Sequence, residues 1–432
     1  MQSSIMDWKQ AEWTYLKEAK TGTLETPEEI TDTVATVIDA VAERGDDAVR
    51  EYTTEFDGVD RDTPKLSDEE IERAIEAVPE RDRETVDEVI ANVRAFHEQQ
   101  LDSIEGFETE IRPGVHVGQR VIPHERVGTY VPGGNHPLIA SVAMSIVPAA
   151  VAGVDNVVTC APPHEEHDGM PHPSQVYAMV QAGADEIFAI GGSQAIAAMA
   201  KGTESVPAVD KITGPGNVFV TEAKRQVYGE VGMEFLAGPT EILIIADGTA
   251  DPEIVAADLL AQAEHDDIAR PILVTTDRDL ADEVRDEMEK QLPELETETT
   301  ARTAWEDRGE IVLAEDVAQA CEIANAYAIE HLHVLTENPR ELMDDLKHYG
   351  SLFLGENAPV VFSDKAVGTN HILPTRRVAR YTGGIWIGTY LRTMTYQELD
   401  EDAAAEVADL AARICEIEGM HAHELSARRR MD

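Results

Sequence analysis

Basic residues are scarce in this chain of 432 residues, which has 35 Lys and Arg against 84 Asp and Glu. The formal net charge of −49 gives a surface that repels nucleic acids and anionic membranes, so neither is an expected partner. In molar salt the electrostatic screening length falls to about 3 Å, and the same surface becomes tolerable. The acidity therefore indicates adaptation to the salty cytoplasm of a halophile and not a catalytic feature.

Cysteines and long apolar runs are also few. Cys160, Cys321 and Cys415 are odd in number and widely spaced, which argues against a disulfide framework or a cysteine zinc cluster. No segment approaches the ~20 apolar residues that a membrane-spanning helix needs. The N-terminus has no basic stretch followed by an apolar run. These absences predict a cytoplasmic protein.

The 432 residues are enough for two to four globular domains, and the hydrophobic fraction of 43% excludes wholesale disorder. Helical spacing covers residues 27–54, with a capping Thr26 and a break at Gly45, and covers 67–104. Further on, apolar runs alternate with helical patterns. Strands are expected at 154–160, 186–190, 209–212, 241–246, 272–275, 311–313 and 333–335. This alternation predicts an α/β fold of two doubly wound, parallel-sheet lobes, incomplete Rossmann-like units with helical N- and C-terminal appendages.

One helix offers a weak signal for chemistry. It begins with Asp251 as its cap and Pro252 in its first turn. Gln262 and His265 are three residues apart and therefore share a face near its end. The alternative is a surface histidine that interacts with the helix dipole, and spacing alone leaves both interpretations open.

The adjacent pair Glu330-His331 stands where a helix passes into a strand. Exposed turns of this kind can face a cleft, and two different titratable groups suit sequential proton transfers. A local ion pair is the structural alternative.

Two further segments carry candidate ligands. Asp364 and His371 lie in a loop rich in turn-forming residues, and Glu418 and His423 close the C-terminal helix. Histidines that interact with the helix dipole are the alternative at that C-terminal end. The oxygen and nitrogen donors of Gln262, His265, Asp364 and His423 suit a borderline cation such as zinc. Spacing does not by itself select these four residues.

The chain lacks a GxGxxG turn between a strand and a helix. Three other glycine turns follow strands, and they contain Tyr130, Gln194 and Asn217. A nucleotide would lie at the carboxyl ends of those strands, but the usual fingerprint is missing. The glycines alone therefore leave dinucleotide binding open.

The ordered series of motifs resembles the histidinol dehydrogenase family over nearly the whole chain. Its members here are GTYVPGG (128–134), GGSQAIAA (191–198), KITGPGNVFVTEAKRQV (211–227), AGPTEILIIAD (237–247), ADLLAQAEHD (257–266), EHL (330–332), GTNHILPT (368–375) and EGMHAH (418–423).

The resemblance implies a four-electron oxidation of L-histidinol to L-histidine through L-histidinal, the end of histidine biosynthesis, with NAD and one Zn²⁺ per subunit. It assigns Glu330 and His331 to acid–base catalysis, and Gln262, His265, Asp364 and His423 to the metal. The substrate site would comprise Thr240, Gln262, His265, His331, Asp364, His371, Glu418 and His423. Tyr130, Gln194 and Asn217 would contact NAD.

The resemblance also implies a division of the chain. Residues 1–25 would form an N-terminal appendage, and 26–129 with 241–382 the lobe that carries the catalytic and metal residues. Residues 130–240 would form the nucleotide lobe, and 383–432 a helical dimerisation tail. An intertwined homodimer whose tail completes the partner's site is expected.

Three features qualify the resemblance. Thr240 stands where Ser also occurs in the family, and Asn135-His136 is more polar than expected beside the nucleotide. Cys160 follows a strand, but its apolar surroundings offer no base to form a thiolate. A zinc hydrolase using the same donors, and a non-catalytic metal store or partner protein, are the alternatives in other classes.

Overall fold

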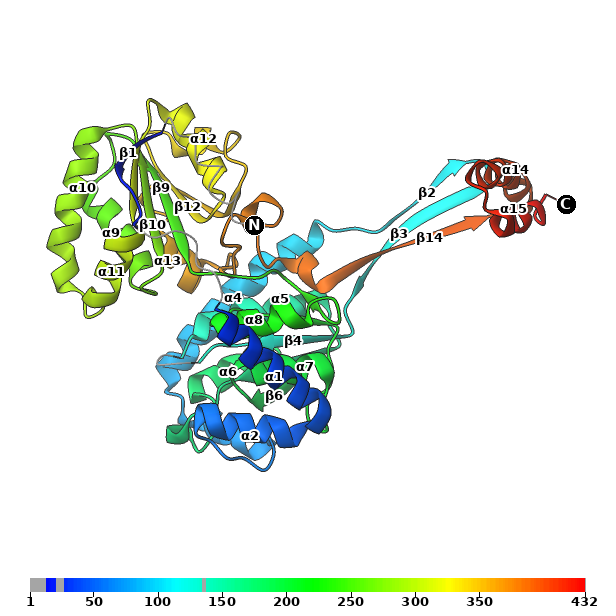
Figure 1. Cartoon of the computed structure of the whole chain (residues 1–432), viewed down its shortest axis with the longest axis horizontal. Coiled ribbons are helices and arrows are strands. Elements are labelled where there is room, and N and C mark those ends of the chain that lie inside the picture. The colour runs from blue at the N-terminus through cyan, green and yellow to red at the C-terminus, as the bar shows by residue number, and fades with distance from the viewer. Residues whose placement is uncertain (1–12, 21–26, 134–136, 432) are drawn as a thin grey trace.

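Two parallel sheets organise the computed structural model, which describes residues 13–20, 27–133 and 137–431. The predicted cap Thr26 and the pair Asn135-His136 lie outside the described residues. Figure 1 shows the two sheets as separate lobes, with a long arm that leaves them. No helix in the described residues is long and apolar enough to cross a membrane.

The first sheet has six strands in the order β1-β11-β10-β9-β12-β13, and all but β1 are parallel. The strands are β1 (Thr14–Lys17), β9 (Glu241–Ala246), β10 (Arg270–Thr275), β11 (Glu310–Leu313), β12 (Ile329–Leu335) and β13 (Tyr349–Leu354). Alternate residues of β9 enter two different cores, because successive strand side chains point to opposite faces. One core contains α9 (Pro252–Ala263), α10 (Arg278–Gln291) and α11 (Glu298–Arg308), and the other contains α12 (Val317–Tyr327).

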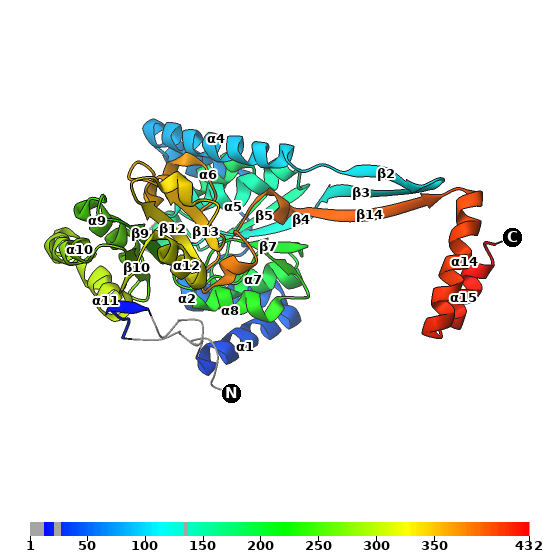
Figure 2. The ribbon, with the colours of Figure 1, turned by 90° about the horizontal axis from the view of Figure 1, so that it is seen from above.

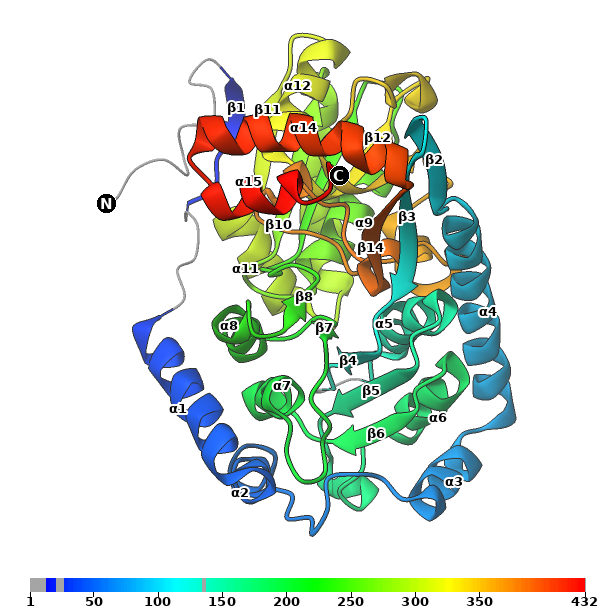
Figure 3. The ribbon, with the colours of Figure 1, turned by 90° about the vertical axis from the view of Figure 1, so that its right-hand side faces the viewer.

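The second sheet has five parallel strands in the order β6-β5-β4-β7-β8. They are β4 (Arg126–Tyr130), β5 (Asn156–Ala161), β6 (Glu186–Ala189), β7 (Lys211–Thr213) and β8 (Gly232–Met233). Helices lie on both faces, as Figure 3 shows, which confirms the doubly wound prediction. One face carries α3 (Asp68–Ala77), α4 (Glu80–Asp102), α5 (Ile139–Ala152) and α6 (Pro173–Ala182). The other carries α1 (Glu28–Arg44), α2 (Asp46–Asp57), α7 (Gly192–Lys201) and α8 (Val218–Val227).

The packing of α1–α4 differs from the division expected from sequence. That division grouped residues 26–129 with 241–382, but these helices bury their apolar faces against the five-stranded sheet. Strand β4, of which all but the last residue falls within 26–129, lies at the centre of that sheet. Amphipathic spacing shows that a helix buries one face, but not which sheet it covers. The predicted break at Gly45 is confirmed, since α1 ends and α2 begins there.

The arm is a three-stranded antiparallel sheet in the order β14-β3-β2. It comprises β2 (Phe107–Arg112), β3 (Val115–Pro123) and β14 (Leu391–Leu399). Figure 2 shows the arm carrying α14 (Glu401–Glu418) and α15 (His421–Arg428) well away from both lobes. Large apolar side chains remain exposed on these elements, among them Ile111, Ile414, Ile417 and Leu425.

Candidate active site

The centre of the candidate site lies where β9 and β12 begin. These strands pair in parallel, so the sheet brings Thr240 and Glu241 beside Glu330 and His331. The prediction of an exposed turn for Glu330-His331 is wrong, because both residues lie within β12 and are only 7% and 3% exposed. The reason is Ala328, whose φ of +49° ends α12 abruptly and lets the strand start at Ile329.

Glu330 is held by several contacts to one oxygen. Its Oε2 accepts hydrogen bonds from Thr240 Oγ1 at 2.7 Å and from the Glu241 backbone N–H at 2.8 Å. Nδ1 of His331 lies 3.4 Å from the same oxygen and 3.0 Å from the Glu241 carbonyl oxygen. The beginning of β9 therefore positions both members of the pair.

His331 presents one ring nitrogen to the site. Its Nε2 is buried, has no hydrogen-bond partner among the described residues and lies 3.9 Å from Asp364 Oδ1. Burial alone would lower the pKa of this imidazole, but the neighbouring Glu330 and Asp364 carboxylates outweigh burial and raise it to about 9. A buried nitrogen with no partner in the protein is an atom suited to meet a ligand.

Gln262 and His265 flank the end of α9. The helix ends at Ala263, with Asp251 capping its start as predicted. Gln262 is buried in the last turn, and its Nε2 donates to Thr240 Oγ1. His265 lies two residues beyond the helix and is exposed. Neighbouring protein still lowers its pKa by desolvation, and the charge of Asp364 opposes that shift, so His265 and Asp364 are neighbours.

Asp364 lies in a single π-helical turn, Ser363–Val367. Its backbone carbonyl oxygen is 2.9 Å from Nδ1 of His371, while Nε2 of His371 is 3.1 Å from Ser141 Oγ on α5. The loop therefore contacts the lobe of the five-stranded sheet as well as the pair on β12.

Glu418 and His423 do not join this group within one chain. They lie on α14 and α15 at the far end of the arm, as Figures 1 and 2 show. In the described part of the chain, no three His, Cys, Asp or Glu side chains are grouped to hold a metal ion. One chain thus brings three of the four predicted metal ligands into one region.

The predicted nucleotide contacts lie at the carboxyl ends of β4, β6 and β7. Tyr130 ends β4, and its hydroxyl oxygen accepts a hydrogen bond from the Gly192 N–H at 3.2 Å. Gln194 is fully buried, and its Nε2 donates to Asp57 Oδ2 at 3.3 Å. Its Oε1 has no partner in residues 13–20, 27–133 and 137–431. Asn217 caps α8 by accepting two backbone hydrogen bonds at 3.1 Å, so it also has a local structural role.

Two residues near these groups were missed by the sequence reasoning. Glu241 contacts both Glu330 and His331 through its backbone, and its carboxylate pairs with Arg270 at 2.9 Å. A carboxylate at the start of an apolar strand was the available signal. Asp57 ends α2 beside Gln194, and nothing in its local sequence distinguishes it from the exposed acidic residues near it in the chain.

Cys160 lies on β5 and is fully buried. Burial raises the pKa of its thiol well above the usual range, which disfavours the thiolate. This supports the sequence interpretation that Cys160 is not a nucleophile.

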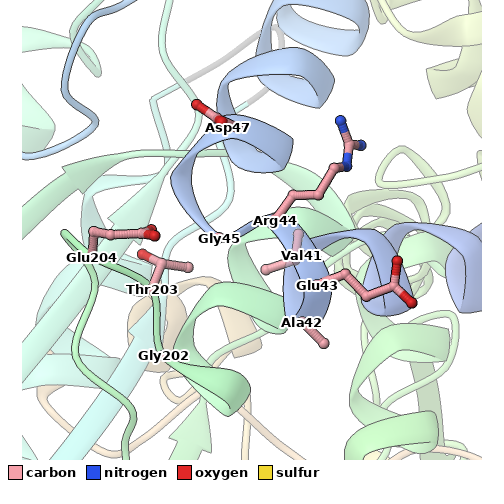
Figure 4. Close-up of a pocket in the computed structure, with 9 residues that line it drawn as sticks. All are labelled: Val41, Ala42, Glu43, Arg44, Gly45, Asp47, Gly202, Thr203 and Glu204. Carbon is pink, nitrogen blue, oxygen red and sulfur yellow. The ribbon is translucent and has the colours of Figure 1, made fainter.

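Two surface hollows do not coincide with the predicted catalytic pair. Figure 4 shows one at the junction of α1 and α2, lined by Glu43, Asp47 and Glu204 among other residues. It contains none of the predicted site residues. Another hollow is lined in part by Phe96, Asn370 and Trp386, next to the loop of His371. The chemistry is therefore located by the buried polar contacts and not by the hollows.

Known proteins resemble the chain along nearly its whole length. It matches the family described as histidinol dehydrogenase over residues 21–431. A "histidinol dehydrogenase homolog" of Shouchella clausii is 48% identical over 395 residues, which are 91% of this chain and 92% of that protein. The histidinol dehydrogenase of Haloarcula marismortui is 42% identical over 406 residues, 93% of this chain and 94% of that protein. The crystal structure of histidinol dehydrogenase from Elizabethkingia anophelis matches with a TM-score of 0.89 and 33% identity, covering 96% of this chain and 94% of that one.

Proposed function

Because the chain belongs to the histidinol dehydrogenase family, an oxidoreductase family, we propose that it oxidises L-histidinol to L-histidine through L-histidinal, with NAD as oxidant. The observation that carries the proposal is the buried Glu330-His331 pair next to Gln262 and Asp364. The enzyme would act in the cytoplasm at the end of histidine biosynthesis.

The donors fit one zinc ion. Gln262, His265 and Asp364 offer an amide oxygen, an imidazole nitrogen and a carboxylate, a set that zinc accepts. Because Nε2 of Gln262 donates to Thr240, its Oε1 is the atom left for the metal. When bound, zinc would supply a Lewis acid that holds the amine and imidazole nitrogens of histidinol. His423 is the fourth proposed ligand, and Glu418 and His371 complete the substrate site.

The protein groups divide the proton transfers. His331 takes the proton of the alcohol in the first oxidation, since its Nε2 is the free buried nitrogen of the pair. Glu330 then takes a proton from the water that attacks the aldehyde. Its Oε2 is already fixed by Thr240 and Glu241, which leaves Oε1 to face the water. Positioned groups of this kind supply general base catalysis without rearrangement.

Two measurements test this function. Two NADH formed per histidinol, followed at 340 nm, support the four-electron reaction, and one NADH contradicts it. His331→Ala should depress both oxidations, whereas Glu330→Gln should mainly impair oxidation of the aldehyde. Equal losses in both half-reactions would refute this division of roles. No NADH at all, with hydrolytic activity instead, would favour the zinc hydrolase.

The nucleotide lobe also fits its cofactor. The unpartnered Oε1 of the buried Gln194 leaves an acceptor for a ligand donor. Tyr130 and Asn217 stand at the carboxyl ends of neighbouring parallel strands, where nucleotides bind in open α/β sheets. NAD, when bound, would supply the hydride acceptor.

The arm supports a homodimer with shared active sites. Within one chain, the helices that contain Glu418 and His423 lie far from the helix that contains Gln262. Apolar side chains on the arm are exposed, Ile417 at 82%, and contact with a partner subunit would bury them. The partner's arm would then bring the fourth ligand. Mixing Gln262→Ala with His423→Ala chains should restore part of the activity, because some mixed dimers hold one intact site. Absence of any recovery would argue for self-contained subunits.

A second candidate differs in its substrate. Arg376 and Arg377 hold left-handed backbone conformations, with φ of +54° and +65°. Such strain is commonly retained at functional positions. The Arg376 side chain lies against Gly238, two residues before Thr240. A guanidinium there suits an alcohol that carries an acidic group. Comparison of NADH formation from histidinol and from small acidic alcohols, with Arg376→Gln as the variant, separates the two candidates.

A further inference from the structure

A carboxylate that the sequence analysis did not select stands among the predicted nucleotide contacts. Asp57 ends α2 and faces the turn Gly191-Gly192 after β6. A Cβ at Gly191 would lie 2.9 Å from Asp57 Oδ1, so the glycine leaves room for the carboxylate. Asp57 Oδ2 accepts from Gln194 Nε2, and the adjacent Gly192 N–H donates to the Tyr130 hydroxyl.

In the part of the chain that the structure describes, no cation pairs with Asp57. Burial is the cause of the raised pKa of its carboxyl, about 6, and no neighbouring charge compensates. In the described residues it forms a hydrogen bond with the neutral amide of Gln194 and no ion pair. A half-buried carboxylate in this state weakens the fold, so stability does not explain its presence. The Asp57 carboxylate can accept further hydrogen bonds, and Oε1 of Gln194 beside it has no partner among the described residues.

We propose that Asp57 binds the ribose hydroxyls of the adenosine half of the dinucleotide and thereby selects NAD over NADP. This inference rests on the proposed use of NAD. A ribose diol offers two O–H donors to one carboxylate, whereas the pyrophosphate would be repelled. Figures 1 and 3 place α2 on the side of the five-stranded sheet away from the six-stranded lobe. The nicotinamide must reach Glu330 and His331 in that lobe, so the adenosine ribose is the one left for Asp57.

The Asp57 carboxylate would also discriminate between NAD and NADP. NADP carries a phosphate on the 2′-hydroxyl, which would remove one donor and place a second negative charge against Asp57. Acidic residues serve this purpose in Rossmann folds, where they follow the second strand. Here the acid comes from a helix that precedes the sheet in sequence, and the usual spacing does not reveal it.

The test measures binding of NAD and NADP to the full-length protein without histidinol, by titration calorimetry in molar KCl. Asp57→Asn should weaken NAD binding about ten- to hundredfold, the loss expected for a charge-assisted hydrogen bond. NADP binding should not weaken to the same extent. The dissociation constant for NADP divided by that for NAD should therefore fall. Glu55→Gln is the matched control, since it removes the same charge from an exposed position of α2.

Three results would overturn the inference. The first is an unchanged ratio of the NADP and NAD dissociation constants in Asp57→Asn. The second is equal affinity of the unaltered protein for both nucleotides. The third is the same fall of that ratio in Glu55→Gln. Nucleotide binding absent from the unaltered protein would overturn the proposed NAD site as well. Asp57→Glu guards against a folding defect, because it keeps the charge. It should weaken NAD binding yet still exclude NADP.

Discussion

The Thr240 hydroxyl joins the proposed base, Glu330, to the proposed metal ligand, Gln262, and its removal should break both contacts. The hydroxyl donates to Glu330 Oε2 at 2.7 Å and accepts from Gln262 Nε2. It therefore fixes the carboxylate and also selects which end of the Gln262 amide faces the proposed metal site. Thr240→Ala removes both contacts, whereas Thr240→Ser keeps a hydroxyl at the same place.

The size of the effect follows from these contacts. A hydrogen bond to a charged group contributes about 1.5–3 kcal/mol. Glu330 keeps its bond from the Glu241 N–H, so its position is loosened but not lost. Loss of one such bond in the transition state corresponds to about 10- to 100-fold in kcat/KM. The aldehyde step should suffer more than the alcohol step, because the proposed role of Glu330 is to take a proton from water in that step.

The assay is steady-state NADH formation from histidinol and, separately, from histidinal. Thr240→Ser should retain nearly full activity in both. Thr303→Ala serves as the control, since the Thr303 hydroxyl bonds within its own helix. Thr240→Ala with full aldehyde activity, or Thr240→Ser as impaired as Thr240→Ala, would refute the coupling.

Three more predictions concern buried groups outside the catalytic pair. Arg270→Met removes the ion pairs that Arg270 makes with the carboxylates of Glu241 and Glu310, whose side chains are only 2% and 1% exposed, and should cost about 3–5 kcal/mol, measured by thermal unfolding; an unchanged Tm contradicts this. Cys160→Ala should leave kcat for both oxidations unchanged, because the buried thiol is not ionised, and a selective loss of aldehyde oxidation would contradict it. The pKa of Asp57 is raised from 3.8 to about 6 on folding, so its ionisation destabilises the fold as pH rises through that interval. Asp57→Asn should therefore unfold at a higher temperature than the unaltered protein at pH 7 to 8, with the difference vanishing near pH 4, and a Tm difference independent of pH would contradict the assignment.

Much of the fold follows from local rules. The apolar run 241–246 is the buried strand β9, and Asp251-Pro252 starts α9, as periodicity and capping predict. Glycine at 45 ends α1 because its φ of +54° suits glycine. The strands β2 and β14 were not predicted, since most of their residues are exposed and lack the buried alternation that marks a strand.

The site was less accessible to local rules. Gln262 and His265 share a helix end, but spacing did not distinguish them from a surface pair. The family motifs made the assignment, and the structure places Gln262 against Thr240 and His331 against Asp364. No local sequence pattern pointed to Asp57, because its proposed role depends on contact with a segment more than 130 residues away.

The sequence by itself determined the family, the α/β class and the acidic surface, because these depend on composition, periodicity and ordered motifs. Only the tertiary structure decided that Glu330 and His331 are buried within a strand and that α1–α4 cover the five-stranded sheet. It also decided that the arm carries α15, which contains His423, away from α9, which contains Gln262. These features depend on which surfaces distant segments bury against one another, and local residue patterns do not specify that choice.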